Sequence, residues 1–148
     1  DVPVWLTEDL VFLGEIPRKH AFEQAEEEKR MVHRPDGAIV PDTLPDDTAL
    51  AFRSESGLVI ITGCSHAGIC NITEQAREVC GENRVAAIIG GLHLLNPRPQ
   101  RLKMTGEYLR KVQPGTLYAC HCTSLAAKIA LAKYCTVQET GVGMRLEW

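Results

Sequence analysis

Three histidines of this chain, His66, His93 and His121, each stand at the end of a short apolar run. The runs occupy residues 58–65, 85–92 and 116–120, and each is bounded by or contains glycine. Continuous apolar runs of this length are typical of parallel strands buried on both faces. Because the carboxyl ends of neighbouring parallel strands meet at one edge of a sheet, we expect the three imidazoles to lie together there. Such a group of imidazoles indicates a metal site.

The regular part of the chain begins at Thr48 and predicts an α/β fold with a mixed sheet. Its pattern predicts a strand hairpin, then helices alternating with buried strands, and a last half-exposed strand. The strands are expected over residues 48–53, 58–62, 85–89, 116–119 and 142–148, and the helices over 69–80, 99–112 and 124–134. Ser124 is a good N-cap for the last helix.

Residues 1–148 are interpreted as a single domain, within which residues 1–47 form an irregular flap or linker region. A short strand is expected over residues 11–14. The acidic stretch over residues 20–30 is compatible with a surface helix or with a flexible flap, because it lacks a clear apolar stripe. With 148 residues, of which 45% are hydrophobic, the chain is long enough to bury a core.

Charge and composition exclude several classes of function. The net charge is −3, and there is no basic stripe with interleaved aromatic residues, so nucleic acid is not an expected partner. No apolar stretch approaches the ~20 residues of a membrane span, and the first residues do not have the pattern expected of a secretory leader. The 6 cysteines could form a disulfide framework, but their position beside histidines favours reduced thiols and a cytoplasmic location.

The residues around the three histidines suggest their chemistry. Cys64 and His66 are expected near the N-terminus of a helix, and thiolate and imidazole are good ligands for zinc or iron. Cys64 could equally be a small core residue. His93 could bind metal, donate a proton or hydrogen-bond a core carbonyl. His121 is interpreted as a ligand, and the flanking Cys120 and Cys122 as packing residues that face away from it.

Other sites and activities find less support in the sequence. His20 and His33 lie among charged residues and are expected on the solvated surface, as are Glu15 and Arg18, which could otherwise bind a substrate from their loop. A serine hydrolase is disfavoured because no Gly-x-Ser-x-Gly motif occurs. A thiol nucleophile would lack an obvious orienting residue. Walker and dinucleotide-binding motifs are absent from the sequence.

Taken together, the histidine motifs resemble a known family. Three segments are similar to the C-terminal half of metallo-β-lactamase-fold proteins. They are Gly-Cys-Ser-His-Ala-Gly-Ile at residues 63–69, followed by Asn71-Ile72, then Gly-Gly-Leu-His-Leu at 90–94 and His-Cys-Thr at 121–123. The most similar branch comprises metal-dependent hydrolases related to the dihydropterin synthase of methanopterin biosynthesis. Residues 15–18 also match that branch.

The resemblance implies an αββα sandwich with a two-metal site between its sheets. This chain would supply one half: a mixed sheet with helices on one face. Cys64 would replace a metal-bridging aspartate, His66 and His121 would be metal ligands, and His93 would act near the reacting group. The metal would be zinc, manganese or iron, and metal-activated water would be the nucleophile for a small substrate, with or without a phosphate group.

The family's main metal motif, His-x-His-x-Asp-His, is absent from this sequence. We therefore expect an incomplete domain with weak or substoichiometric metal and impaired activity. We also expect a homo-oligomer, or pairing with a missing N-terminal half, because one sheet face would otherwise be uncovered. The alternatives are a non-catalytic, self-associating half-domain and a dihydropterin synthase-like transferase.

Overall fold

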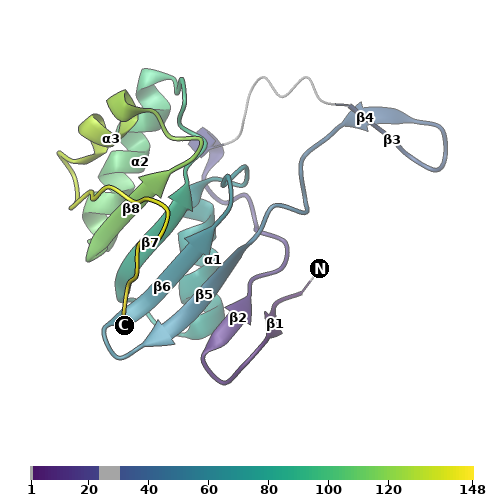
Figure 1. The fold of residues 1–148 in the computed structure, drawn as a ribbon. Coiled ribbons are helices and arrows are strands. Elements are labelled where there is room, and N and C mark those ends of the chain that lie inside the picture. Colours follow the sequence, from purple (N-terminus) through teal and green to yellow (C-terminus); the bar gives the residue numbers. More distant parts are fainter. Residues whose placement is uncertain (1, 24–30) are drawn as a thin grey trace.

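The computed structural model describes residues 2–23 and 31–148 and shows a six-stranded mixed sheet. The strand order is β1-β2-β5-β6-β7-β8; β1, β2, β5 and β6 pair antiparallel, and β6, β7 and β8 run parallel. The helices cover one face of this sheet, which confirms the predicted fold class (Figure 1). The strands of this sheet are β1 (Val4–Trp5), β2 (Leu10–Phe12), β5 (Ala49–Ser54), β6 (Gly57–Thr62), β7 (Val85–Gly91) and β8 (Thr116–Cys120). The helices are α1 (Ile69–Cys80), α2 (Pro99–Val112) and α3 (Leu125–Leu131).

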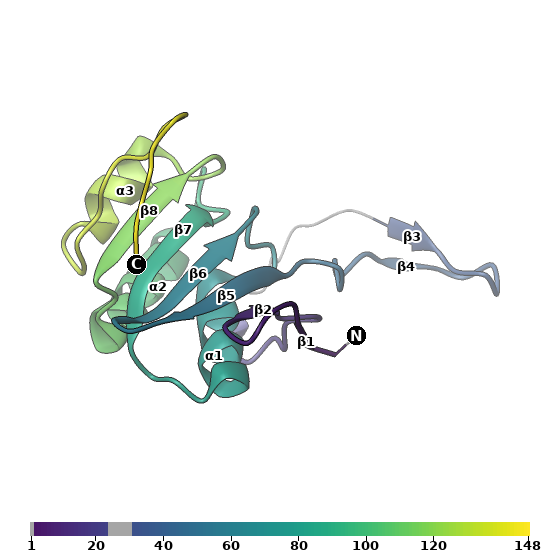
Figure 2. The ribbon, with the colours of Figure 1, turned by 60° about the horizontal axis from the view of Figure 1, so that its bottom comes forward.

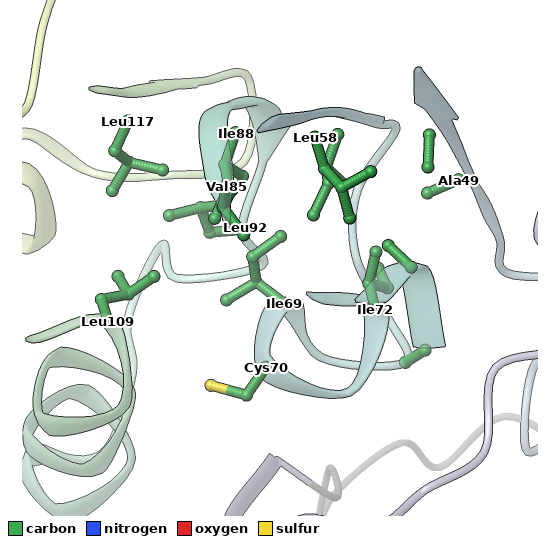
Figure 3. Packing of buried hydrophobic residues seen from close by; sticks show 14 of the residues in the cluster. Ala49, Leu58, Ile69, Cys70, Ile72, Val85, Ile88, Leu92, Leu109 and Leu117 are labelled. Atoms are coloured by element: carbon green, nitrogen blue, oxygen red, sulfur yellow. The ribbon is translucent and has the colours of Figure 1, made fainter. Parts of the chain in front are cut away.

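The main core lies between the sheet and the helices. Leu58 of β6 packs here with Ile69 and Ile72 of α1 and Leu109 of α2 (Figure 3). These side chains and the alternate β6 residue Ile60 are fully buried. Burial of each such side chain contributes roughly 1.5–3 kcal/mol. This layer fixes the sheet on one side and leaves the ends of β6, β7 and β8 to build a site.

Most predicted helices and strands agree with the structure, but the strand predicted at the C-terminal end of the sequence does not. The helices predicted over 69–80 and 99–112 have the observed bounds, and Ser124 is the N-cap of α3, accepting a hydrogen bond of 3.2 Å from the Ala127 N–H. The strand predicted over 142–148 is wrong. A strand there would have to pair with the outer edge of β8, but residues 136–138 occupy that edge. Leu117 of β8 exchanges backbone hydrogen bonds with Thr136 and Gln138. The C-terminal tail instead crosses the helix-free face, where Leu146 packs (Figure 1).

The N-terminal segment forms two strands at the edge of the sheet and a separate hairpin. A strand is present where one was expected over 11–14, but β2 spans Leu10–Phe12 and ends two residues earlier. A separate hairpin, β3 (Met31–His33) with β4 (Ile39–Pro41), extends away from the body (Figure 2). The acidic stretch begins with a single 3₁₀ turn, η1 (Ala21–Glu23), and its residues 24–30 lie outside the described residues. None of the described helices is both long and apolar enough to span a bilayer.

The two N-terminal histidines differ in environment. His33 is exposed on β3, as expected. His20 is partly buried, which contradicts the expectation of a solvated side chain. Its ring packs edge-on against Tyr108, with the ring centroids 5.1 Å apart, and lies 5.4 Å from Phe22. These aromatic neighbours come from α2 and η1, so the contact links the N-terminal segment to the helical layer.

Glu23 is a buried carboxylate that caps helix α1. Its side chain is only 1% exposed and accepts hydrogen bonds from the backbone N–H groups of Cys70 (2.9 Å) and Asn71 (2.8 Å). The first N–H groups of a helix lack partners within the helix, and Gly68 at the N-cap has no side chain to serve them. Gly68 also leaves the space that the carboxylate occupies, since a Cβ there would overlap Glu23. The negative charge suits this end of the helix.

The Glu23 carboxyl predicts a pH dependence of stability. Burial raises its pKa above the ordinary value, although hydrogen bonds from Cys70 and Asn71 and the charge of Arg101 act in the opposite direction. The folded state then holds the proton more tightly than the unfolded state. The group's contribution is therefore fully present below its unfolded-state pKa and is lost as the pH rises through the folded-state pKa.

Glu23→Gln removes this titration. We expect the stability of the wild type relative to the variant to fall as the pH rises from about 4 to about 8, measured by urea unfolding. The slope is the test, because the amide also changes the helix cap and adds a constant offset. Glu55→Gln, at an exposed carboxyl in the β5–β6 turn, controls for the loss of one charge. A difference that rises with pH would contradict the prediction.

Candidate metal centre

The carboxyl ends of β6, β7 and β8 meet at one edge, where their loops are hydrogen-bonded to one another. The Gly91 N–H donates to the Gly63 carbonyl (2.8 Å), and the Leu94 N–H donates to the Cys122 carbonyl (2.8 Å). Side chains add to this: Ser65 Oγ donates to the Gly91 carbonyl (2.6 Å), and Thr123 Oγ1 accepts from the Leu92 N–H (2.9 Å). The loops that carry the candidate residues are therefore held in fixed relative positions.

Each of these loops contains one residue other than glycine in the left-handed backbone region. The φ angles are 58° at Ser65, 52° at His93 and 49° at His121. Such a conformation costs on the order of 1–3 kcal/mol per residue and is kept where the surroundings enforce it, which is often at functional sites. Here it turns the chain sharply after each strand, so that the histidines stay at the edge of the sheet.

Cys64, His121 and Cys122 form one cluster of potential ligands. The two sulfur atoms and an imidazole nitrogen of His121 all lie within 4.8 Å of one another. Two of these residues were predicted as ligands, but Cys122 was expected to face away from His121. That expectation is wrong because it assumed strand-like alternation through residues 120–122. The left-handed conformation of His121 breaks the alternation and brings both side chains to the same side.

His66 and His93 form a neighbouring pair. Their rings meet edge to face, with the centroids 4.7 Å apart. His66 Nδ1 lies 3.6 Å from Asp47 Oδ1, and the other oxygen of Asp47 accepts a hydrogen bond of 2.7 Å from the Ala67 N–H. The four predicted site residues are thus divided: Cys64 and His121 share one cluster, and His66 and His93 lie together against Asp47.

Asp47 is a site residue that the sequence analysis missed. It stands just before β5, whose Ala49 is paired with Thr62 at the end of β6. In an antiparallel hairpin, the start of one strand lies beside the end of the other. The predicted hairpin register therefore already contained the signal that Asp47 lies beside the loop that carries His66.

Arg18 supports the site from the N-terminal segment. Its guanidinium donates to the carbonyl of His66 (2.7 Å) and to the carbonyls of Thr43 (2.8 Å) and Leu44 (3.1 Å). It therefore joins the loop before β5 to the loop after β6 rather than facing solvent as expected. Glu15 is exposed.

The surroundings of the Cys64 thiol disfavour its ionisation. Burial raises the pKa of the Cys64 thiol above its ordinary value, and the adjacent Cys122 thiol and the Asp47 carboxylate raise it further. Two thiolates this close repel each other, and a bound cation would remove that repulsion. All 6 cysteines of the chain are free. The donor set of thiols, imidazoles and a carboxylate fits a zinc-type metal.

Comparison with solved structures gives the class of the fold. The crystal structure of Tm1679, a metal-dependent hydrolase of the β-lactamase superfamily, superposes on 100% of this chain with a TM-score of 0.84 and 25% sequence identity, and the match covers 57% of the Tm1679 chain. Together with the histidine motifs, this match confirms the resemblance: the chain has the fold of the metallo-β-lactamase superfamily.

Two proteins of Methanocaldococcus jannaschii are similar to this chain in sequence. The 7,8-dihydropterin-6-methyl-4-(beta-D-ribofuranosyl)-aminobenzene-5'-phosphate synthase is 36% identical over 92 residues, which are 62% of this chain and 31% of the synthase. The uncharacterized protein MJ0448 is 29% identical over 131 residues, which are 88% of this chain and 46% of MJ0448. The chain thus spans less than half the length of these curated relatives. No family model matches it.

Proposed function

We propose that this chain is part of a metal-dependent hydrolase. The observation that carries the proposal is the group of thiol, imidazole and carboxylate side chains at the carboxyl edge of β6, β7 and β8, held by hydrogen bonds between the loops. This edge is where α/β proteins commonly bind their ligands. The fold match to a metal-dependent hydrolase supports the same conclusion.

The proposed metal ligands are Cys64, His66 and His121, and the metal is zinc, or manganese or iron in its place. A divalent ion held by these residues would lower the pKa of bound water and so supply a nucleophile near neutral pH. Asp47 has a positioning role: a carboxylate beside His66 Nδ1 favours the tautomer with its proton on that nitrogen, and Nε2 is then available as a ligand. His93, against the ring of His66, is placed to donate or accept a proton at the substrate.

The chain is proposed to need a second unit to complete its site. The helix-free face of the sheet carries Phe12, Phe52 and Ile61, and Phe12 and Ile61 are 38% and 42% exposed. Apolar residues gathered on one face indicate an interface. The unit on this face would be an N-terminal half carrying the His-x-His-x-Asp-His motif, or a second copy of the chain. We expect it to bury more than about 2,000 Å².

The substrate is proposed to be a small molecule, with or without a phosphate group. The proposed location is the cytoplasm, whose reducing conditions suit the free thiols. A dihydropterin synthase-like transferase is the second candidate function, because the relative that is 36% identical is such a synthase. A non-catalytic, self-associating half-domain would keep the apolar interface and lack turnover.

A metal titration with the chain alone and with the N-terminal half added separates these possibilities. We expect weak or substoichiometric metal and little activity for the chain alone, and a joint rise in metal content and in turnover of phosphodiester or lactone substrates after complementation. Light scattering at micromolar concentration checks the interface. A stable monomer that binds metal stoichiometrically and turns over as fast as the complemented protein would contradict the proposal.

A further inference from the structure

We propose that Cys122 is a metal ligand, and that Cys64, His121 and Cys122 together form a thiolate-rich site that prefers thiophilic ions such as zinc to manganese. The inference rests on the proposed function for the expectation that a metal binds at this edge. It adds a ligand that neither the sequence pattern nor the family resemblance suggested, and it specifies the class of metal ion.

The geometry of the three side chains is close to that of a zinc site. Zinc lies ~2.3 Å from thiolate sulfur and ~2.0–2.1 Å from imidazole nitrogen, so tetrahedral ligand atoms are about 3.5–3.8 Å apart. The ligand atoms of Cys64, His121 and Cys122 all lie within 4.8 Å of one another. The remaining approach requires only small rotations of side chains, and His121 is exposed and free to make one.

The backbone around Cys122 is shaped for its sulfur atom. The His93 N–H donates to Cys122 Sγ at 3.2 Å, a bond that would stabilise a thiolate and fix its position. Gly91 leaves the space for the sulfur, because a Cβ at that position would lie 2.6 Å from Cys122 Sγ. Cys122 is 8% exposed, so its sulfur is largely shielded from solvent.

The donor set determines which ion is favoured. Two thiolates and one imidazole select zinc, cobalt or cadmium, whereas manganese and magnesium prefer carboxylate and water oxygens. Three protein ligands leave one position open, as in catalytic zinc sites. His66 lies outside this cluster among the described residues, against His93 and Asp47, where it can serve a second ion or the substrate.

Cobalt(II) titration of the reduced 148-residue chain tests the ligand set, because cobalt–thiolate bonds give a charge-transfer absorption band. We expect this band in the wild type, and we expect Cys122→Ser to reduce its intensity by about half and to weaken binding at least tenfold. Cys120→Ser is the matched control: Cys120 is two residues away and outside the cluster among the described residues, so the band should be unchanged. Circular dichroism monitors folding of each variant.

Replacing His66 with alanine distinguishes this inference from the ligand set of the proposed function. If Cys122 is a ligand, His66→Ala keeps the thiolate band. If His66→Ala abolishes binding while Cys122→Ser leaves the band intact, the inference is wrong and the proposed metal site stands. If manganese binds more tightly than zinc, the thiolate-rich site is likewise wrong. If neither metal binds the chain at any concentration, the inference is wrong, and the metal content of the complemented protein then decides whether the metal site of the proposed function stands.

A measurement on the wild type avoids any effect of substitution on folding. Saturating zinc should protect Cys64 and Cys122 from alkylation by iodoacetamide, read from peptide masses, while Cys120 reacts at an unchanged rate. Equal labelling of Cys122 with and without zinc would overturn the inference.

Discussion

Replacing His121 with alanine is expected to lower kcat/KM of the complemented hydrolase by about 10²–10⁴-fold, which corresponds to roughly 2.7–5.5 kcal/mol of transition-state stabilisation. His121 is common to the ligand set of the proposed function and to the thiolate cluster. Its loss removes a neutral nitrogen ligand and leaves the thiols as the remaining ligands of the cluster, so metal content should fall together with the rate. Metal analysis beside steady-state kinetics checks both quantities.

The control for this prediction is His33→Ala, which removes an exposed imidazole from the projecting hairpin of β3 and β4. Its rate and metal content should equal those of the wild type. A His121→Ala protein that keeps full metal and full turnover would show that these histidines do not bind the catalytic ion. If the rate falls while the metal content stays complete, His121 acts on the substrate and is not a metal ligand.

Replacing Gly90 with alanine is expected to destabilise the fold by about 2–5 kcal/mol. Gly90 in β7 has a φ of 138°, which side-chain-bearing residues rarely adopt, and a Cβ there would overlap the carbonyl oxygen of Thr62 in β6. The left-handed half of backbone space costs roughly 1–2 kcal/mol for an L-residue, and forced overlap in a packed interior adds typically 1–3 kcal/mol. Urea unfolding measures the change.

Gly63→Ala is the matched control for stability. Gly63 lies at the end of the neighbouring strand, and a Cβ there has no heavy atom within 4 Å. Its stability should stay within about 0.5 kcal/mol of the wild type. If the two variants unfold at the same urea concentration, the close approach of β7 to β6 does not constrain the edge that carries the site.

The local sequence determined the regular elements around the core. Apolar periodicity predicted α1 and α2 and the strands β5, β6, β7 and β8, because burial of one face is a repeating property that neighbouring residues share. The same logic placed His66, His93 and His121 at one sheet edge, since parallel strands present their carboxyl ends together. It failed at residues 142–148, where alternation alone could not reveal that residues 136–138 occupy the edge of β8.

Only the tertiary structure decided which side chains at that edge meet. Glu23 reaches the start of α1 from a segment more than forty positions earlier in the chain. Cys122 joins Cys64 because His121 adopts a left-handed φ, a conformation that local sequence disfavours and that hydrogen bonds between the loops enforce. Periodicity describes residues within one element, whereas these contacts depend on how separate loops fit together, so sequence patterns alone did not contain them.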